Sequence, residues 1–210
     1  MNILATGMGW INHTPGGLNR YFADYLHALT VRGHRVVGII TTNGDEAGDK
    51  PAYMLEAFAG NKPRGSFGRM LAFRSTLRSM LRSGEFDVFN PHFAMYASLL
   101  TRGLLPNHMP VITHFHGPWA HESQVEAGGN RLASELRIRA KKSIEMLVYR
   151  RSDRFIVLSE YFRDVLTDDY GIPKDRITII PGAVDIDQFR PAIDRQGLRG
   201  EYGIDEQAKV

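Results

Sequence analysis

The chain has 210 residues, 43% hydrophobic and 23% charged, so it can bury a sizeable core and lacks the composition of a disordered protein. It has no cysteine, which excludes disulfides, thiolate metal ligands and a thiol nucleophile. The net charge of +3 is too small to indicate nucleic-acid binding. No run approaches the roughly 20 apolar residues of a spanning helix, and the opening MNILATG does not resemble a signal peptide. We therefore expect a soluble, cytoplasmic protein.

Apolar runs and helical patterns alternate from the start of the chain. Residues 2–6 (NILAT) predict a first strand and residues 35–41 (RVVGIIT) a second. The segment between them has apolar residues at helical spacing, and Gly33 marks the end of that helix. These apolar positions are Leu18, Phe22, Tyr25, Leu26 and Leu29. A strand, helix and strand within about 40 residues predict a parallel pair with a right-handed crossover.

The same alternation continues to the end of the chain. Further strands are expected at 53–58, 86–90, 111–115, 154–158 and 176–180. Further helices are expected at 67–82, 94–105 and 161–170. A long helix before the strand at 154–158 is indicated by Leu132, Leu136, Ala140, Ile144 and Leu147. The pattern predicts an α/β fold with a doubly wound, mostly parallel, Rossmann-like sheet, whose ligands bind at the carboxyl ends of the strands.

Two adjacent glycines, Gly16 and Gly17, lie between the first strand and its helix. Glycines there let a ligand approach the backbone, and the free N–H groups of a helix N-terminus attract phosphate. The alternative is a simple tight turn. The third glycine of a dinucleotide fingerprint and the Gly-Lys-Ser/Thr of a P-loop are both missing.

Histidines follow the strand expected at 111–115. His114 and His116 would lie on the same face of that strand, and His121 follows closely. Three imidazoles could bind a metal ion, but no carboxylate stands at a supporting spacing. A structural role for His114 is the simpler interpretation.

The helix expected at 67–82 carries a row of arginines. Arg74, Arg78 and Arg82 recur every four residues and share one side of the helix. The row is either a solvated face or a surface for anionic lipid or a phosphorylated acceptor. Nucleic acid is not expected as a partner, because no basic–aromatic interleaving accompanies the charge.

The last third of the chain carries the most specific motif. A strand ends in Pro181-Gly182-Ala183-Val184-Asp185, followed by Phe189-Arg190-Pro191. Together with Pro15-Gly16-Gly17 and His116-Gly117, it resembles the N-terminal domain of family 4 glycosyltransferases of the GT-B fold. The usual family form has Asn-Gly where this chain has Gly182-Ala183. Asp185-Ile186-Asp187 also fits the Asp-x-Asp metal motif of the other glycosyltransferase fold, but its surroundings favour GT-B.

The resemblance implies a retaining transferase that moves a sugar from a nucleotide-sugar donor to a glycan, lipid-linked or small-molecule acceptor. His116 would be the catalytic-site residue, and Gly16 and Gly17 would bind the donor phosphates. His92, Trp119 and Asp185 would bind acceptor or sugar, with burial of the Trp119 indole as an alternative. Neither a cofactor nor an essential metal is implied.

The resemblance also implies a domain boundary. Residues 1–192 would form the acceptor-side domain, and residues 193–210 a linker helix and the start of a C-terminal donor-binding domain. The Glu-x7-Glu element of that second domain is not in the sequence, so we expect the 210 residues alone to be inactive. The arginine row would allow peripheral contact with the inner face of the membrane. Two alternatives stay open: a non-catalytic module for acidic glycan or lipid, and a GT-B-fold sugar-nucleotide epimerase.

Overall fold

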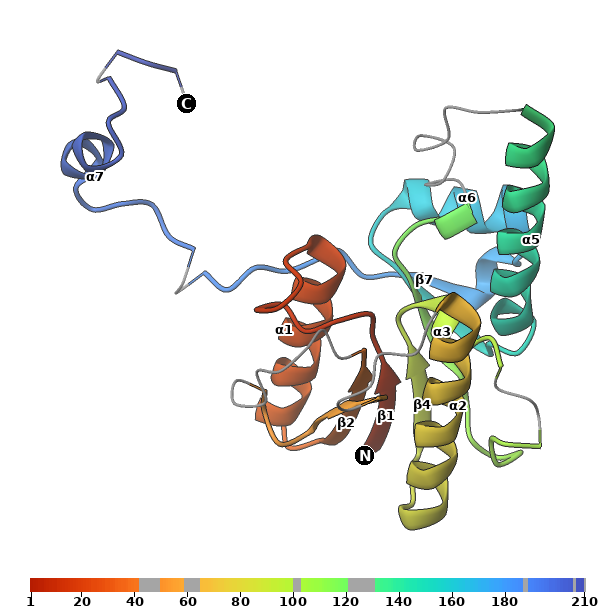
Figure 1. Ribbon diagram of the computed structural model, residues 1–210. Helices are drawn as coiled ribbons and strands as arrows, with labels where there is room; N and C mark the ends of the chain where they lie inside the picture. The colour runs from red at the N-terminus through yellow and green to blue at the C-terminus, as the bar shows by residue number, and fades with distance from the viewer. Residues whose placement is uncertain are drawn as a thin grey trace.

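The computed structural model describes residues 1–41, 50–58, 65–99, 103–120, 131–186, 189–205 and 207–209, with the backbone alone at 131–133. Strands and helices alternate along the chain as the sequence predicted (Figure 1). The strands are β1 (Asn2–Thr6), β2 (Arg35–Ile40), β3 (Met54–Glu56), β4 (Val88–Pro91), β5 (Ile112–Phe115), β6 (Arg154–Val157) and β7 (Ile177–Ile179). The α-helices are α1 (Gly17–Val31), α2 (Gly65–Ser83), α3 (Ala94–Ala97), α5 (Arg131–Tyr149), α6 (Glu160–Tyr170) and α7 (Arg195–Glu201). A short 3-10 helix spans Lys174–Arg176.

All described strand pairs are parallel, which confirms the predicted fold class. One sheet has the order β3-β2-β1-β4 and the other has the order β5-β6-β7. The two sheets meet where Phe89 of β4 bridges Val111 and its N–H donates to the Pro110 carbonyl at 3.0 Å. The strands thus follow the order 3-2-1-4-5-6-7, and the direction of winding reverses between β1 and β4. In such folds this reversal point is where ligands bind.

Hydrophobic clusters cover both faces of the sheet. Ile3 and Ala5 of β1 pack with Phe22 and Leu26 of α1 on one face. Leu4, whose side chain points to the opposite face, belongs to the larger cluster with α2, α3, α5 and α6. Alternate residues of one strand therefore serve two cores, as a doubly wound sheet requires.

Two glycines let α1 pack closely on the sheet. A Cβ on Gly7 would lie 2.5 Å from the Phe22 ring, and one on Gly38 would lie 2.5 Å from Leu26 and 2.6 Å from Met54. These distances are far below van der Waals contact. No pattern in the sequence indicated this role of the two glycines.

Helix α2 buries one apolar face, whereas the face predicted for α5 is not the one that the structure buries. On α2, Met70, Phe73 and Leu77 are buried. On α5, the predicted face includes Leu136 and Leu147, which are 66% and 43% exposed. Glu145, Val148 and Tyr149 are buried instead. The helix is rotated because Glu145 finds polar partners inside and the Tyr149 ring fills the core.

Helix α3 is much shorter than the predicted span 94–105. It ends at Ala97, because the Ser98 N–H donates to the Met95 carbonyl three residues back and the Ser98 hydroxyl donates to the same oxygen at 2.7 Å. A turn follows, and residues 100–102 lie outside the described part of the chain.

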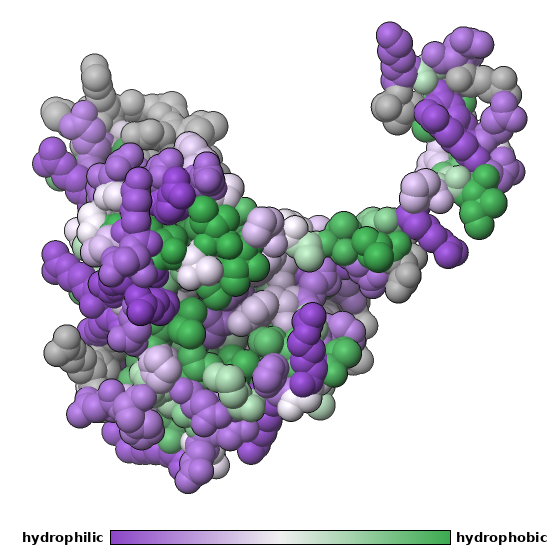
Figure 2. Space-filling view, turned by 180° about the vertical axis from the view of Figure 1, so that it is seen from behind, coloured by the Kyte–Doolittle hydropathy of each residue, from purple (hydrophilic) through white to green (hydrophobic). Residues whose placement is uncertain are grey.

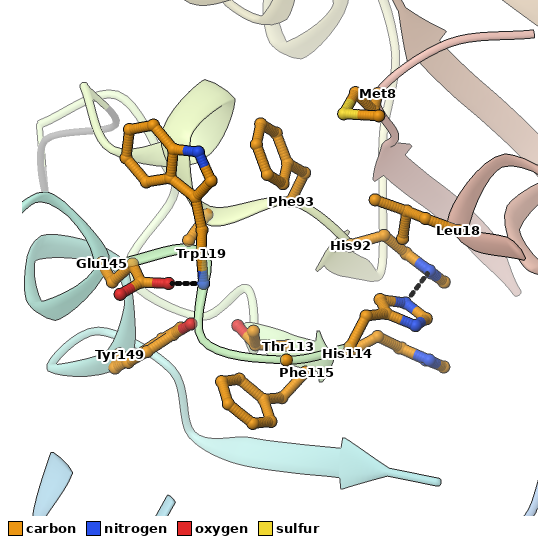
Figure 3. A pocket seen from close by; sticks show the side chains of 13 residues that line it. Met8, Leu18, His92, Phe93, Thr113, His114, Phe115, Trp119, Glu145 and Tyr149 are labelled. Atoms are coloured by element: carbon orange, nitrogen blue, oxygen red, sulfur yellow. Dashed lines mark hydrogen bonds between the residues drawn. The ribbon is translucent and has the colours of Figure 1, made fainter. Parts of the chain in front are cut away.

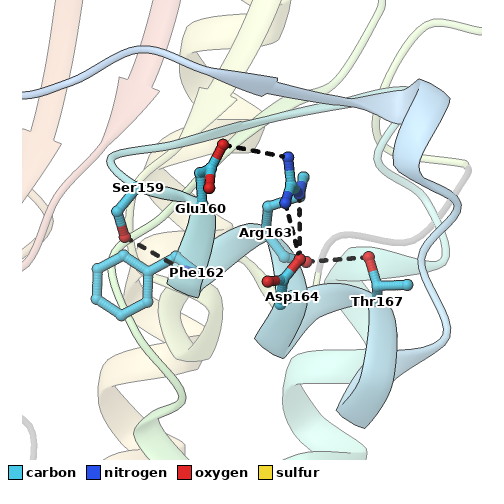
Figure 4. Close-up of polar contacts among 6 residues, drawn as sticks. All are labelled: Ser159, Glu160, Phe162, Arg163, Asp164 and Thr167. Carbon is cyan, nitrogen blue, oxygen red and sulfur yellow. Dashed lines mark hydrogen bonds and ion pairs between the residues drawn. The ribbon is translucent and has the colours of Figure 1, made fainter.

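Helix α6 has end signals at both termini. At its start, the Ser159 hydroxyl accepts from the Phe162 N–H at 3.3 Å and caps the first turn (Figure 4). Arg163 lies 3.9 Å from Glu160 and 3.1 Å from Asp164, so the first turn also carries ion pairs. Gly171 ends the helix in the left-handed conformation, with φ 67°.

After β7 the chain leaves the body of the domain as an extended segment that leads to α7 (Figure 1). Hydrophobic residues line this segment (Figure 2), and Ile180, Val184, Ile186 and Phe189 are exposed on it. The predicted boundary at residue 192 falls just before α7 and stays a prediction. No helix in the described residues is both long and apolar enough to cross a membrane.

Candidate active site at the strand ends

Three histidines meet at the carboxyl edge of the sheet. His92 follows β4, His114 lies in β5 and His116 follows β5, so the alternation of side chains brings the three rings to one place. They line a cavity of about 320 Å³ together with Met8, which follows β1, and residues of α1 and α5. In Figure 3, His92 and His114 lie at one end of the pocket and Trp119 and Phe93 at the other.

The imidazoles are stacked and hydrogen-bonded. The His92 and His114 rings lie 4.0 Å apart at an interplanar angle of 13°. His92 Nδ1 lies 3.2 Å from His116 Nε2. The centres of these two rings are 5.4 Å apart at an angle of 25°. The nitrogen–nitrogen distance plus the radius of each ring nearly equals this separation. The two nitrogens therefore lie on the line that joins the ring centres.

Burial keeps all three rings neutral. Desolvation, with smaller effects of His114 and His116, holds the pKa of His92 well below its ordinary value. Desolvation and the neighbouring His116 lower the pKa of His114 to about 3, and desolvation lowers that of His116 to about 4. Near pH 7 the site therefore contains imidazoles and no imidazolium.

Helix α1 closes one side of this histidine cluster. The Tyr21 hydroxyl lies 3.3 Å from His114 Nδ1, and its ring packs edge-on to His116 with centres 4.9 Å apart. The Tyr25 ring lies 4.8 Å from that of His114 and 5.0 Å from that of His92. Burial, together with Tyr21, raises the pKa of Tyr25 to about 12. Both tyrosines therefore remain protonated hydrogen-bond donors.

A buried carboxylate supports the opposite wall. Glu145 of α5 is 1% exposed. Its Oε1 accepts from the backbone N–H of Trp119 at 2.9 Å, and its Oε2 accepts from the Tyr170 hydroxyl at 2.7 Å. The carboxylate thus fixes the backbone just beyond His116, in the segment where Gly117 adopts φ 137°.

The Trp119 indole is half-buried. Its ring meets Phe93 edge-on at 6.0 Å, and the Lys141 ammonium lies 4.4 Å from its centre. One of its faces is therefore already used in a cation–π contact. The packing role is therefore observed, and a role in sugar binding stays a prediction.

Within the described part of the chain, the three histidines form a group that could hold a metal ion. Each offers one nitrogen, and these nitrogens lie within 4.8 Å of one another. However, the rings are nearly parallel, so their in-plane lone pairs do not converge on one point. His121, which the sequence suggested as a third ligand beside His114 and His116, lies outside the described residues.

The comparison of sequences identifies the family. The profile of Glycosyltransferase Family 4 matches residues 15–188, which is most of the chain. The chain belongs to glycosyltransferase family 4. This confirms the resemblance inferred from the Gly-Gly loop, the His-Gly strand end and the closing loop.

Individual relatives agree with this assignment. Mannosylfructose-phosphate synthase from Agrobacterium fabrum is 32% identical over 104 residues, covering 45% of this chain and 23% of the relative. The fold is similar to that of sucrose-phosphate synthase from Thermosynechococcus elongatus (TM-score 0.72, 16% identity, 97% of this chain and 53% of that one). It is also similar to that of WaaG, a glycosyltransferase of lipopolysaccharide biosynthesis (TM-score 0.67, 17% identity, 99% and 52%).

The same fold occurs in an epimerase. UDP-GlcNAc 2-epimerase from Neisseria meningitidis, solved with UDP-GlcNAc bound, matches with a TM-score of 0.55 at 16% identity, over 85% of this chain and 46% of that one. This chain spans about half the length of these solved structures.

The glycines of this family 4 chain lie at the start of α1. Gly16 is the residue before the helix and Gly17 is its first residue. Both are exposed, and a Cβ on either would meet nothing within 4 Å. Neither glycine is therefore required by packing. Leu18, the next residue, lines the histidine pocket, which places the helix N-terminus beside it.

Asp185 lies apart from the pocket-lining residues, on the extended segment. Its carbonyl accepts from the Phe189 N–H at 2.8 Å, and the Phe189 ring lies 5.9 Å from the Arg20 guanidinium of α1. The closing loop of the family motif thus reaches the first turns of α1, near Gly16 and Gly17.

The arginine row divides into two kinds of residue. Arg78 and Arg82 are exposed. Arg74 is half-buried, and its guanidinium donates to the Leu99 carbonyl just after α3. Arg74 therefore has a structural contact, and the exposed part of the row is shorter than the sequence suggested.

Sequence reasoning missed three residues of this site, namely Tyr21, Glu145 and Asn90, whose Oδ1 lies 3.0 Å from His92 Nε2. Asn90 had a usable signal, because it precedes His92 by two and so lies on the same side of the strand end. Glu145 stands three and four residues before the buried Val148 and Tyr149, which makes it an acid on the core side of a helix. Tyr21 lies far from the histidines in sequence, and only the docking of α1 brings it there.

Proposed function

We propose that the protein containing this chain is a retaining glycosyltransferase that transfers a sugar from a nucleotide-sugar donor to a glycan, lipid-linked or small-molecule acceptor. One observation carries the proposal. The family 4 match over residues 15–188 includes a cavity at the reversal point of the sheet, and His116 of the family's His-Gly motif lines it. The nucleotide sugar bound by the epimerase of the same fold supports a donor of this class.

In this proposal His116 serves the donor sugar as a neutral imidazole. Because burial lowers its pKa to about 4, it carries no proton to donate as a general acid near neutral pH. A neutral ring can accept a hydrogen bond from a sugar hydroxyl and can lie beside a developing positive charge without repelling it. The proton of the acceptor would pass to the donor's own phosphate oxygen, so the protein's contribution is to position the reactants.

Gly16 and Gly17 would serve the donor phosphates. They open the 15-residue helix α1, which has no acidic residue in its first turn and no side-chain cap. Its first N–H groups are therefore available to an anion, and the helix dipole favours negative charge there. Stabilising phosphate charge is the main electrostatic task when a nucleoside diphosphate leaves.

The pocket fits an epimerase less well. Such an enzyme needs carboxylates free to exchange protons with the sugar. Among the described residues that line the cavity, Glu145 is the one carboxylate, and both its oxygens accept hydrogen bonds from the protein. The geometry therefore favours transfer.

The exposed side of α2 supports contact with an anionic membrane surface or acceptor. Phe67 and Leu71 are 65% and 45% exposed. With Arg78 and Arg82 they follow spacings of four, seven and four residues, which place them on one side of the helix. A helix side that carries both exposed apolar residues and cations has the amphipathic pattern of interfacial helices. The non-catalytic module for acidic glycan or lipid would use this same surface.

Further parts of the proposal concern the rest of the reaction. We propose that the second domain supplies most of the nucleotide contacts and that His92, Trp119 and Asp185 contribute to the acceptor or sugar side. We also propose that no metal ion or cofactor is required, so EDTA should leave transfer unchanged.

The test is transfer by the full-length protein that carries this chain. It would be incubated with a panel of UDP-, GDP- and ADP-sugars and candidate acceptors, and release of the nucleoside diphosphate would be measured. We expect release with one donor class, lost in His116→Ala and retained in His108→Ala, which changes an exposed histidine. Transfer by the 210 residues alone would contradict the proposal that a second domain supplies most of the nucleotide contacts. Acceptor or liposome binding without release from any donor would favour the non-catalytic module.

A further inference from the structure

The histidine pocket contains a chain of hydrogen bonds whose proton positions follow from its first member. The side-chain amide of Asn90 donates through Nδ2 to the backbone carbonyl of Ile112. A carbonyl oxygen only accepts, so the NH2 group of Asn90 must face Ile112 and its Oδ1 must face the other way. That oxygen lies 3.0 Å from His92 Nε2.

The orientation of Asn90 fixes the tautomer of His92. Because Oδ1 of Asn90 only accepts, the hydrogen must reside on His92 Nε2. A neutral imidazole carries one N–H, so Nδ1 of His92 keeps its lone pair. Both side chains are 2% exposed, so water does not compete for these bonds.

The same step carries the assignment to His116. Its Nε2 lies 3.2 Å from His92 Nδ1, on the line between the ring centres. Because His92 Nδ1 has only a lone pair, His116 Nε2 carries the hydrogen of this bond. The remaining nitrogen, Nδ1, then has the lone pair. No described residue forms a hydrogen bond with that atom, although His116 lines the cavity.

We infer that Asn90 and His92 are positioning residues that hold His116 in its Nε2–H tautomer, so that His116 meets a ligand as a hydrogen-bond acceptor through Nδ1. Through Nδ1, His116 selects a ligand group that donates a hydrogen bond, such as a sugar hydroxyl. A carbonyl or phosphate oxygen, which only accepts, would be disfavoured at this atom. The role toward a sugar rests on the function proposed above. The tautomer itself does not.

The arrangement opposes chelation of a metal ion by the three histidines. The His114 ring stacks on His92 and supports its plane, while the lone pair of His92 is taken up by His116. A metal ion bound by all three nitrogens would have to break this bond and rotate at least one ring out of the stack.

The experiment is long-range ¹H–¹⁵N NMR of the histidine side chains in the ¹⁵N-labelled 210-residue chain at pH 7.5, without donor. We expect pure Nε2–H patterns for His92 and His116. His92→Asn, whose Oδ1 can take the place of the ring Nδ1 as acceptor, should preserve the His116 pattern. His92→Leu and Asn90→Leu should convert it into a mixture of tautomers.

Several outcomes would overturn the inference. They are an Nδ1–H or mixed pattern for His116 in the unmodified chain, an unchanged pattern in His92→Leu, and a joint shift of all three histidines with one equivalent of Zn²⁺. The spectrum of the unmodified chain tests the inference even if a variant fails to fold. A fixed tautomer in a full-length protein that transfers no sugar would contradict only the proposed function.

Discussion

The hydroxyl of Tyr170 donates a 2.7 Å hydrogen bond to Oε2 of Glu145 and so ties α6 to α5 at the wall of the pocket. Glu145 and Tyr170 are both buried, at 1% and 5% exposure. The other carboxylate oxygen holds the Trp119 backbone. One side chain thereby links two helices to the segment that follows His116.

Tyr170→Phe should destabilise the domain by about 1–3 kcal/mol, because a buried carboxylate loses a donor that no water can replace. Burial and Glu145 also raise the pKa of Tyr170, so the hydroxyl is a donor at any working pH. Urea unfolding followed by circular dichroism measures the change. Tyr161→Phe, at a tyrosine that is 69% exposed on the same helix, is the matched control. Equal stability of the two variants would show that the bond contributes nothing.

Gly38→Ala should destabilise the domain by about 1–3 kcal/mol through overpacking between β2 and α1. The new methyl would lie 2.5 Å from Leu26 and 2.6 Å from Met54. The same urea titration would be compared with Gly103→Ala, where nothing lies within 4 Å. If Met54 and Leu26 shift freely, the two variants will unfold at the same urea concentration, and the close packing is not a constraint.

Acid should weaken the fold through the buried histidines. His114 and His116 have pKa values of about 3 and 4 in the folded chain, against about 6.5 when unfolded. Between these values the unfolded chain binds more protons, so stability is complete above about pH 6.5 and falls toward pH 4. The loss is on the order of 1 kcal/mol per pH unit for each histidine.

Unfolding in urea at pH 7.5, 6 and 5 tests this dependence. His116→Gln should flatten the slope, whereas His108→Gln, at an exposed position, should leave it unchanged. Identical slopes in the original chain and in His116→Gln would refute the assignment of a depressed pKa to this ring.

Much of the fold was predictable because its signals are local. Alternating apolar runs located every described strand, and the helical pattern at 161–170 gave α6 to within one residue. The convergence of His92, His114 and His116 was predictable in part, since parallel strands bring their carboxyl ends to one edge. The early end of α3 was not, because it depends on Ser98 bonding locally to the Met95 carbonyl, which residue spacing does not reveal. The rotation of α5 was not, because the Glu145 carboxylate found partners that only the tertiary structure supplies. The proton positions along the hydrogen bonds from Asn90 to His116 were not predictable either, because they depend on interatomic distances that residue spacing in the sequence does not reveal.

Charge reversal on α2 should weaken binding to anionic vesicles. Arg78→Glu with Arg82→Glu removes two exposed cations, each contributing about 1 kcal/mol near such a surface, so affinity should fall by at least about tenfold. Co-sedimentation with phosphatidylglycerol vesicles measures it. Arg32→Glu with Arg195→Glu changes the net charge equally at exposed sites elsewhere. A similar loss in both pairs would mean that overall charge, and not the α2 surface, is responsible.

Gly17→Ala should separate a phosphate-binding role from a packing role at the start of α1. A Cβ there meets nothing within 4 Å, and alanine is the better helix former, so stability should be unchanged or slightly higher. If the donor phosphates approach this backbone, the methyl group will hinder them and raise the KM for the nucleotide sugar in the full-length protein. Gly103→Ala, also at a glycine with open space, should leave the KM unchanged. An unaltered KM in Gly17→Ala would return this glycine to the simpler reading of a turn, and the phosphates would then have to bind elsewhere.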